Sequence, residues 1–242
     1  MAQMANARCV EVKEELPSSQ GHTKSKPIVF FDMDGVLTRE KSSWNYVHSR
    51  LGVDNDLNYS LFRAGRIGYL EFMRRDINLW LQETGEVSVS QIRDILNEIE
   101  LFPGVVEATR TLSQGGFYMV IVSGGLMWLA ERVGKETGIR EVYANIILSL
   151  GGKVLPEGKA IVDPKRKDIV INDVISKYKP EYTISVGDSP DDEKMFMVTD
   201  YSISMNNEPS FVNARGFDLK TENLQDCSDL ILGIRDQRNE IS

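Results

Sequence analysis

The residues most suited to chemistry are two acids, Asp32 and Asp34, separated by one residue and followed at once by Gly35. They come directly after the apolar run 28–31 (Ile-Val-Phe-Phe), which predicts a short, fully buried strand. Two neighbouring anions inside a protein are costly unless a positive charge joins them, and a divalent cation with oxygen ligands would serve. An ordinary strand followed by a polar turn would have the same sequence. The rest of the chain must therefore decide between a cation site and a simple turn.

A serine and two glycines follow the next predicted strand. This strand covers 117–122, and Ser123, Gly124 and Gly125 separate it from a predicted helix at 126–135. A hydroxyl and free backbone N–H groups at the start of a helix are suited to binding a phosphate. An ordinary Ser-Gly turn that caps the helix explains the same residues, and for this segment alone it is the simpler interpretation.

A third predicted strand, 183–186, is followed by the acidic segment 187–192 (Gly-Asp-Ser-Pro-Asp-Asp). Residues 189–192 are explained as the cap and first turn of a helix. Asp188 precedes this cap and is not explained by it. In a parallel sheet, Asp188 would lie at the same edge as the first two acids, where carboxylates and phosphate oxygens could hold Mg²⁺.

A lysine is predicted to face these strand ends. Lys167 opens a predicted helix at 167–178, and its positions i+3, i+4 and i+7 are apolar. It therefore shares the side of the helix that packs on the sheet. Its charge would balance the carboxylates and hold a phosphate, although Lys165 and Arg166 are close alternatives.

Strand and helix patterns alternate along most of the chain, which predicts an α/β fold with a parallel sheet covered by helices on both faces. The segment 42–100 has helical periodicity and almost no strand signal, which predicts an inserted helical subdomain. We expect a core formed by 27–38 and 103–242, an insert at 39–102 and a flexible tail at 1–26. The other expected elements are helices at 103–113, 190–198 and 224–232, a hairpin within 142–162, and strands at 201–204 and near 217.

Three apolar stripes predict the helices of the insert. They consist of Trp44, Val47 and Leu51; of Leu70, Met73, Ile77 and Leu81; and of Ile92, Ile95, Leu96 and Ile99. Gly52 and Gly85 are suited to end the first two helices, and Ser90 is suited to cap the third. We expect Trp44, Phe72 and Trp80 to pack inside the insert, although one of them could line a pocket.

The composition argues against several classes of protein. The chain has 242 residues and is 41% hydrophobic, which allows a sizeable core. A net charge of -8 argues against nucleic-acid binding, no apolar run can span a membrane, and the N-terminus lacks the apolar stretch of a signal peptide. The cysteines (Cys9 and Cys227) and histidines (His22 and His48) are too few for a disulfide framework, a zinc site or Ser-His-Asp chemistry, so the cytoplasm is expected. No feature of the sequence indicates an oligomeric state.

Taken in order, the motifs at 32–38 (DMDGVLT), 123–125 (SGG), Lys167 and 187–192 (GDSPDD) resemble those of the haloacid dehalogenase superfamily of phosphohydrolases. The insert resembles the helical cap of the phosphoserine phosphatase branch of that superfamily. The resemblance implies a Rossmann-like parallel sheet with a helical cap. It also implies an Mg²⁺-dependent phosphomonoesterase that acts on a small phosphorylated metabolite.

The resemblance implies distinct roles for the first two acids. Asp32 would attack the phosphorus and form an aspartyl-phosphate. Asp34 would act first as an acid and then as a base, and an acid at this position favours a phosphate ester over a halide substrate. Mg²⁺ would be held by Asp32, by the backbone carbonyl of Asp34 and by Asp188.

The same resemblance assigns the phosphate-binding groups. Ser123 and the Gly124 N–H would bind the phosphoryl oxygens, and Lys167 would add positive charge. Asp192 would support Lys167 or the metal from behind, and Asp191 is the weaker candidate for this task.

The insert departs from the pattern of the phosphoserine-specific members. Those members place an acid just after the first motif and an arginine in the cap. Here Glu40 or Lys41 stands near the place of the acid, and Asp76 stands in the place of the arginine. Phosphoserine is therefore one candidate substrate. We expect four arginines of the insert to be solvated charges: Arg63, Arg66, Arg74 and Arg75.

Two alternatives stay open at this point. The enzyme could transfer the phosphoryl group to a hydroxyl other than water. The chain could also be a signalling module like the receiver domains, which group acids at strand ends and become phosphorylated. Receiver domains lack the acid two residues after the phosphorylated one and the helical insert, which favours the enzyme.

Overall fold

The computed structural model describes residues 25–206 and 215–241. The predicted tail, with Cys9 and His22, lies almost entirely outside these residues. Within them, no helix combines the length and the apolar character that crossing a membrane requires.

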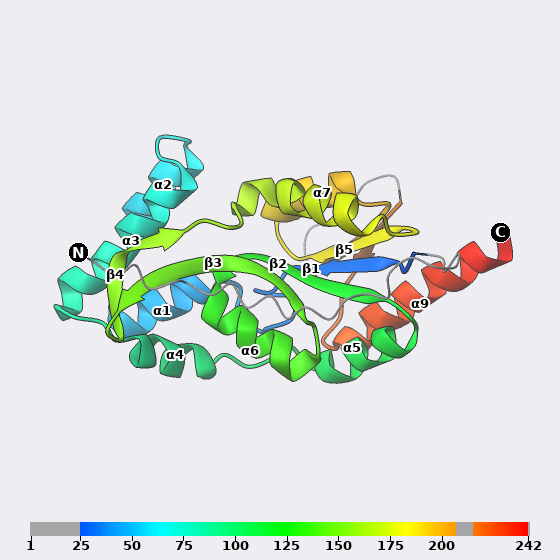
Figure 1. The fold of residues 1–242 in the computed structure, drawn as a ribbon, viewed down its shortest axis with the longest axis horizontal. Coiled ribbons are helices and arrows are strands. Elements are labelled where there is room, and N and C mark those ends of the chain that lie inside the picture. The colour runs from blue at the N-terminus through cyan, green and yellow to red at the C-terminus, as the bar shows by residue number, and fades with distance from the viewer. Residues whose placement is uncertain (1–24, 207–214, 242) are drawn as a thin grey trace.

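A seven-stranded sheet runs through the protein in the order β4-β3-β2-β1-β5-β6-β7 (Figure 1). Neighbouring strands are parallel, except that β3 and β4 form an antiparallel hairpin. This confirms the predicted α/β fold and the hairpin excursion. The strands are β1 (Ile28–Phe31), β2 (Tyr118–Leu126), β3 (Glu141–Leu150), β4 (Lys153–Lys159), β5 (Thr183–Gly187), β6 (Tyr201–Met205) and β7 (Gly216–Leu219).

Helices cover both faces of the sheet, as the burial of β1 requires. Ile28 and Phe30 pack toward α7 and α8 on one face, whereas Val29 and Phe31 pack toward α5, α6 and α9 on the other. All four side chains are buried, because helices cover both faces of a central parallel strand. These helices are α5 (Val105–Gln114), α6 (Met127–Thr137), α7 (Lys167–Tyr178), α8 (Glu193–Val198) and α9 (Leu224–Ile241), with short 3₁₀ turns η1 (Pro164–Arg166) and η2 (Pro190–Asp192).

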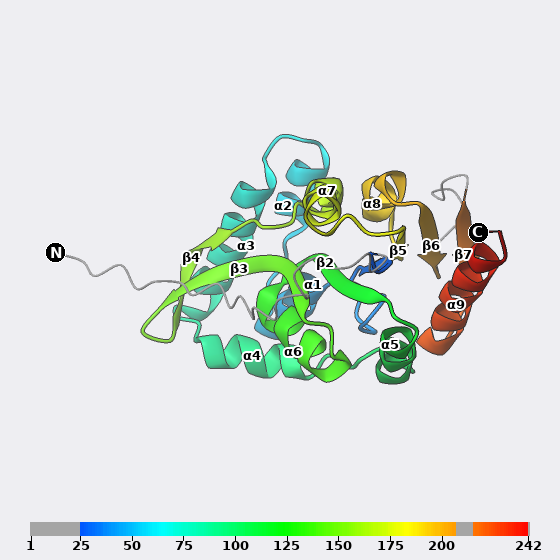
Figure 2. The same cartoon turned by 45° about the vertical axis from the view of Figure 1, so that its right-hand side comes forward.

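In the sequence, four helices follow β1 and precede α5. They lie together at one end of the sheet (Figure 2). We call the segment 39–102, which contains these helices, the helical insert. Its two ends lie side by side, since Arg39 N–H donates to the Glu100 carbonyl at 3.0 Å and Phe102 N–H to the Leu37 carbonyl at 2.9 Å. The hairpin β3–β4 reaches the insert, where Val154 N–H donates to the Val87 carbonyl at 2.8 Å. The helices are α1 (Ser43–Leu51), α2 (Asp56–Arg63), α3 (Tyr69–Thr84) and α4 (Val89–Asn97).

Details of the insert differ from the sequence-based expectations. Helix α2 was not predicted, because it buries little apart from Asn58 and Phe62 and so lacks an apolar stripe. Ser90 does not cap α4; Ser88 does, since its hydroxyl accepts from the Gln91 N–H. Leu70 is exposed, because the buried side of α3 is formed instead by Tyr69, Phe72, Met73, Asp76, Ile77 and Trp80.

Candidate active site

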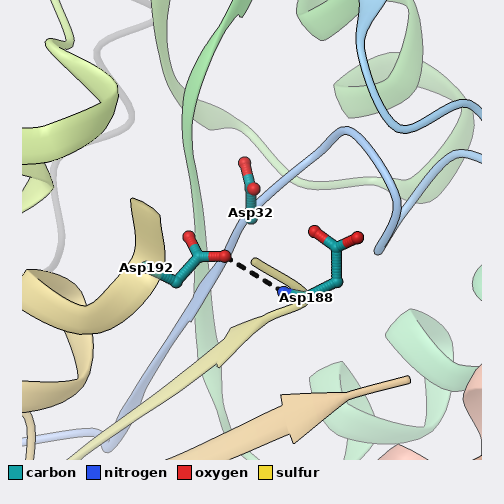
Figure 3. A group of neighbouring side chains, drawn as sticks. All are labelled: Asp32, Asp188 and Asp192. Atoms are coloured by element: carbon teal, nitrogen blue, oxygen red, sulfur yellow. Dashed lines mark hydrogen bonds between the residues drawn. The ribbon is translucent and has the colours of Figure 1, made fainter. Parts of the chain in front are cut away.

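Two acids from neighbouring central strands meet at one edge of the sheet. Asp32 follows β1 and Asp188 follows β5, and these strands pair in parallel. Asp192 joins them from η2, so that one carboxylate oxygen of each residue lies within 4.8 Å of the others (Figure 3). All three side chains are buried. The parallel sheet therefore brings together the acids whose convergence the sequence indicates.

Lys167 is the positive charge of this cluster. Its Nζ lies 2.9 Å from Asp32 Oδ2 and 2.6 Å from Asp192 Oδ1, and the side chain is only 2% exposed. Burial alone would lower the pKa of Lys167, but the charges of Asp192 and Asp32 outweigh this and raise the pKa above its ordinary value. The lysine is therefore charged and bound to two acids, and its neighbour Lys165 instead donates to the Phe62 carbonyl of the insert.

Asp192 shapes the loop as well as holding Lys167. Its Oδ2 accepts from the Asp188 N–H at 3.0 Å (Figure 3). The same oxygen accepts from the Ser189 N–H at 3.0 Å and from the Ser189 hydroxyl at 3.1 Å. Both oxygens of Asp192 are thus engaged by protein donors. Asp191 points elsewhere and pairs with Arg63 of the insert at 2.6 Å.

Asp34 is held by the first residue of α1. The backbone N–H and the hydroxyl of Ser43 both donate to Asp34 Oδ2, each at 2.8 Å. The other oxygen, Oδ1, is buried and has no hydrogen-bond partner in the described structure. Burial raises the pKa of Asp34 to about 6, although both bonds from Ser43 lower it.

Gly35 lets Asp188 approach the turn that follows the first strand. Its φ is 79°, a left-handed conformation that side chains disfavour, and a Cβ at this position would lie 2.2 Å from Asp188 Oδ2. The same oxygen lies 3.2 Å from Lys41 Nζ, whose side chain is 70% exposed. The position near which the resemblance places an acid therefore presents an ammonium group to Asp188.

Ser123 and Gly124 lie inside a strand, which corrects the predicted loop at a helix N-terminus. Strand β2 continues to Leu126, and its register against β3 shifts between Val122 and Leu126, as in a β-bulge. Ser123 is buried, and its hydroxyl accepts from the Gly125 N–H at 3.0 Å. Phe31 pairs with Ile121, so Asp32 and Ser123 both follow this pair, Asp32 after the end of β1 and Ser123 within the bulged part of β2.

Three donors hold the carbonyl of Gly124. They are Trp44 Nε1 at 3.1 Å and the Tyr69 hydroxyl at 2.6 Å, both from the insert, and Asn145 Nδ2 at 2.8 Å from β3. Local patterns did not single out Tyr69 and Asn145, because these bonds join residues 55 and 21 positions away from Gly124. Trp44, Phe72 and Trp80 are all buried as expected, and Trp44 in addition touches the bulge.

Asp76 is a buried acid of the insert that makes its hydrogen bonds within the insert. Asp76 is fully buried, and its carboxylate accepts from Asn55 Nδ2 and Asn58 Nδ2, both at 2.9 Å, and lies 3.1 Å from His48 Nε2. His48 Nδ1 accepts from Trp80 Nε1 at 2.6 Å, so the histidine proton lies on Nε2 and points at Asp76. Three of the four arginines that were expected to be solvated pair with carboxylates near the surface: Arg63 with Asp191, Arg74 with Glu157 and Arg75 with Glu71.

The acidic cluster fits a hard divalent cation. Burial raises the pKa of Asp32 well above its ordinary value, against the charge of Lys167, and the nearby carboxylates raise it further. Burial and the charge of Asp192 raise the pKa of Asp188 to about 6. One buried ammonium thus faces three buried carboxylates, so a cation with oxygen ligands would relieve the remaining repulsion.

Comparison with known proteins agrees with this geometry. Residues 27–196 match the haloacid dehalogenase-like hydrolases, and the chain belongs to this family. It is 30% identical over 224 residues to a probable phosphoserine phosphatase of Schizosaccharomyces pombe, across 89% of this chain and 72% of the relative.

Two further proteins match the chain, one in sequence and one in fold. The chain is 25% identical over 206 residues to a phosphoserine phosphatase of Archaeoglobus fulgidus. This alignment includes 83% of this chain and 58% of that relative. A solved structure of a phospho-aspartyl intermediate analogue of phosphoserine phosphatase superposes with a TM-score of 0.71 at 16% identity, over 86% of this chain and 99% of that one. These matches confirm the predicted fold and the resemblance to the phosphoserine phosphatase branch.

Proposed function

We propose that this protein is an Mg²⁺-dependent phosphomonoesterase that hydrolyses a small phosphorylated metabolite through an aspartyl-phosphate. The observation that carries the proposal is a second acid near Asp32, the partly buried Asp34, whose Oδ1 atom is buried. Its Oδ1 has no partner in the described structure and is free to exchange a proton. An alkoxide leaving group needs that proton and a halide does not, so the site favours a phosphate ester. Membership of a hydrolase family also favours an enzyme over a receiver-like module.

The first half of the proposed reaction uses both acids. A carboxylate oxygen of Asp32 forms a bond to phosphorus while the bond between phosphorus and the ester oxygen breaks. The electron pair of that bond stays on the ester oxygen, and Asp34 gives its proton to this oxygen, so the product leaves as an alcohol. The phosphoryl group is then an acyl phosphate on Asp32.

The second half reverses the role of Asp34. As a carboxylate it takes a proton from water, and the water oxygen forms a bond to phosphorus. The bond between phosphorus and Asp32 breaks, which releases inorganic phosphate and restores the Asp32 carboxylate. One group can serve in both steps because burial keeps its pKa, about 6, close to neutrality.

Hydrogen-bond donors and positive charges at the site would bind the phosphoryl group. The Ser123 hydroxyl and the Gly124 N–H are proposed to donate to its oxygens, and Lys167 adds positive charge next to Asp32. Asp192 holds Lys167 in place through their 2.6 Å contact. Mg²⁺ would be held by the carboxylates of Asp32 and Asp188 and the backbone carbonyl of Asp34, and it would neutralise charge on the phosphoryl group.

We also propose that the helical insert (39–102) is a lid over this site that selects the leaving group. Trp44 and Tyr69 of the insert donate to the Gly124 carbonyl, which supports a lid in contact with the phosphate-binding strand. A lid excludes water from the reacting phosphoryl group and favours a small substrate. The named relatives support phosphoserine, whereas the buried Asp76 and the ammonium of Lys41 depart from the pattern of the phosphoserine-specific members.

The substrate is best identified by measuring phosphate release from a panel of phosphorylated metabolites that includes phosphoserine. We expect hydrolysis of one small phosphomonoester at a kcat/KM far above that of the others. Adding an alcohol separates hydrolysis from phosphoryl transfer, because a transferase would yield a new phosphate ester. Failure to release phosphate from any ester, including p-nitrophenyl phosphate, would contradict the proposed function.

Removing the metal is expected to abolish activity reversibly. EDTA should stop hydrolysis of p-nitrophenyl phosphate, and excess Mg²⁺ should restore it, because the buried carboxylates repel an incoming phosphoryl dianion. Thermal melting with and without Mg²⁺ is an independent readout, since a cation that binds the folded state raises the melting temperature. Full activity after exhaustive chelation would rule out the metal requirement.

A further inference from the structure

The first residue of α1 makes the closest polar contacts to Asp34. Ser43 is fully buried, and both its N–H and its hydroxyl donate to Asp34 Oδ2 at 2.8 Å. Its Oγ also accepts from the Leu126 N–H at 3.2 Å, at the end of β2. Because the Leu126 amide can only donate, the hydroxyl proton of Ser43 is directed at Asp34.

These contacts make the two oxygens of Asp34 unequal. Oδ2 receives two donors, so a proton on this oxygen would point toward donors and lose a hydrogen bond. Oδ1 is buried and has no partner in the described structure. The oxygen that can carry and deliver a proton is therefore Oδ1.

The neighbouring strand is built to accept Ser43. A Cβ at position 125 would lie 2.6 Å from Ser43 Oγ and 2.8 Å from Asp34 Oδ2, so glycine is needed for this close approach. Trp44, the next residue of α1, donates to the Gly124 carbonyl at 3.1 Å. Two consecutive residues of α1 thus fix Asp34 and the bulge of β2 together.

We infer that Ser43 is a positioning residue that commits Asp34 Oδ2 to the protein and presents Oδ1 to the leaving oxygen. The inference rests on the proposed function and deepens it. As the Asp32 oxygen bonds to phosphorus, the bond to the ester oxygen breaks, its electron pair stays on that oxygen, and the proton on Asp34 Oδ1 moves to it. Without the Ser43 hydroxyl, Oδ2 keeps only the bond from the Ser43 N–H, so Oδ2 can carry the proton in place of Oδ1, and proton delivery loses its direction.

The test compares leaving groups in the Ser43→Ala variant. Phenyl phosphate needs a proton on its departing oxygen, whereas the leaving group of p-nitrophenyl phosphate is stabilised as an anion. We expect kcat/KM for phenyl phosphate to fall about 10- to 100-fold, with that for p-nitrophenyl phosphate changing by less than about 3-fold. Because kcat/KM reports steps up to the first phosphoryl transfer, later hydrolysis of the aspartyl-phosphate does not mask the difference.

Ser42→Ala is the matched control. Ser42 is the N-cap of the same helix, and its hydroxyl accepts from the Asn45 N–H without touching Asp34. This variant should weaken the helix start and leave the ratio of the two kcat/KM values unchanged. If Ser43→Ala does not fold, Ser43→Cys keeps the shape with a weaker donor and should shift the same ratio in the same direction.

The outcomes separate the two proposals. An equal loss on both esters, or no loss, would overturn the role of Ser43 while leaving the phosphatase intact. A wild-type protein that hydrolyses neither ester would overturn the proposed function and this inference together.

Discussion

The Asp32→Asn variant is expected to lose at least about 10⁴-fold in kcat for p-nitrophenyl phosphate, because an amide cannot attack phosphorus. The substituted side chain has nearly the same shape, and its oxygen can accept from either the Met33 N–H or Lys167, while Lys167 keeps its 2.6 Å contact with Asp192. The variant should therefore remain folded. Phosphate release measures the activity, and circular dichroism with thermal melting checks the fold.

A surface variant controls for the loss of one negative charge. Asp173 is an exposed acid of α7, whereas Lys167 of the same helix is buried, and Asp173→Asn should hydrolyse the same substrate at the wild-type rate. Turnover by Asp32→Asn near that of Asp173→Asn would show that another group attacks phosphorus.

The Lys167→Met variant is expected to be destabilised by about 3–5 kcal/mol at neutral pH, because it leaves buried carboxylates without their ammonium partner. Lys167 bridges Asp32 and Asp192 at 2.9 and 2.6 Å, and all three side chains are buried. Methionine keeps much of the volume of lysine, so the expected loss reflects charge more than packing. Chemical denaturation at several pH values measures the free energy of unfolding.

The pH dependence distinguishes a charge effect from a packing effect. Losing the ammonium raises the folded-state pKa of Asp32 further, so the folded variant binds more protons than its unfolded state does. Its stability deficit should therefore be largest at neutral pH and shrink as pH falls through the range in which Asp32 becomes protonated. A deficit that stays constant with pH would contradict the electrostatic account.

Another lysine of the same helix is the control for this variant. Lys177 pairs with Glu141 at 3.5 Å, and its side chain is 60% exposed. Because exposed ion pairs contribute little, Lys177→Met should change the free energy of unfolding by less than about 1 kcal/mol.

The convergence of the acids was predictable because it follows from topology alone. Parallel strands end at one edge of the sheet, so residues that directly follow β1 and β5 must be neighbours. The position of Lys167 was predictable for a similar reason, since its apolar i+3, i+4 and i+7 positions turn that side of α7 toward the sheet.

The contacts that refine the site were not predictable from local patterns. Ser43 joins Asp34 to Leu126, and Asn145 joins Gly124 to Val162, through bonds between segments distant in the sequence. The predicted end of strand β2, at Val122, was wrong for a related reason. Glycines suggested a break after Val122, whereas a bulge paired with β3 continues the strand to Leu126.

Helix boundaries in the insert show the same limit at short range. Ser88 and Ser90 are both suited to cap α4, and their hydroxyls lie 2.9 Å apart. The cap is Ser88 because Val89 N–H donates to the Gly152 carbonyl of the β3–β4 turn, which fixes where the helix begins. A tertiary contact thus decides between two residues of nearly equal propensity.

Trapping the covalent intermediate tests directly whether Asp32 is the group that attacks phosphorus. Wild-type protein is mixed with p-nitrophenyl phosphate and Mg²⁺, quenched in acid within milliseconds, digested and analysed by mass spectrometry. We expect one phosphorylated peptide, with the modification on Asp32 and labile to hydroxylamine as an acyl phosphate is. Turnover without any phosphorylated peptide, or a stable phosphate on another residue, would contradict it.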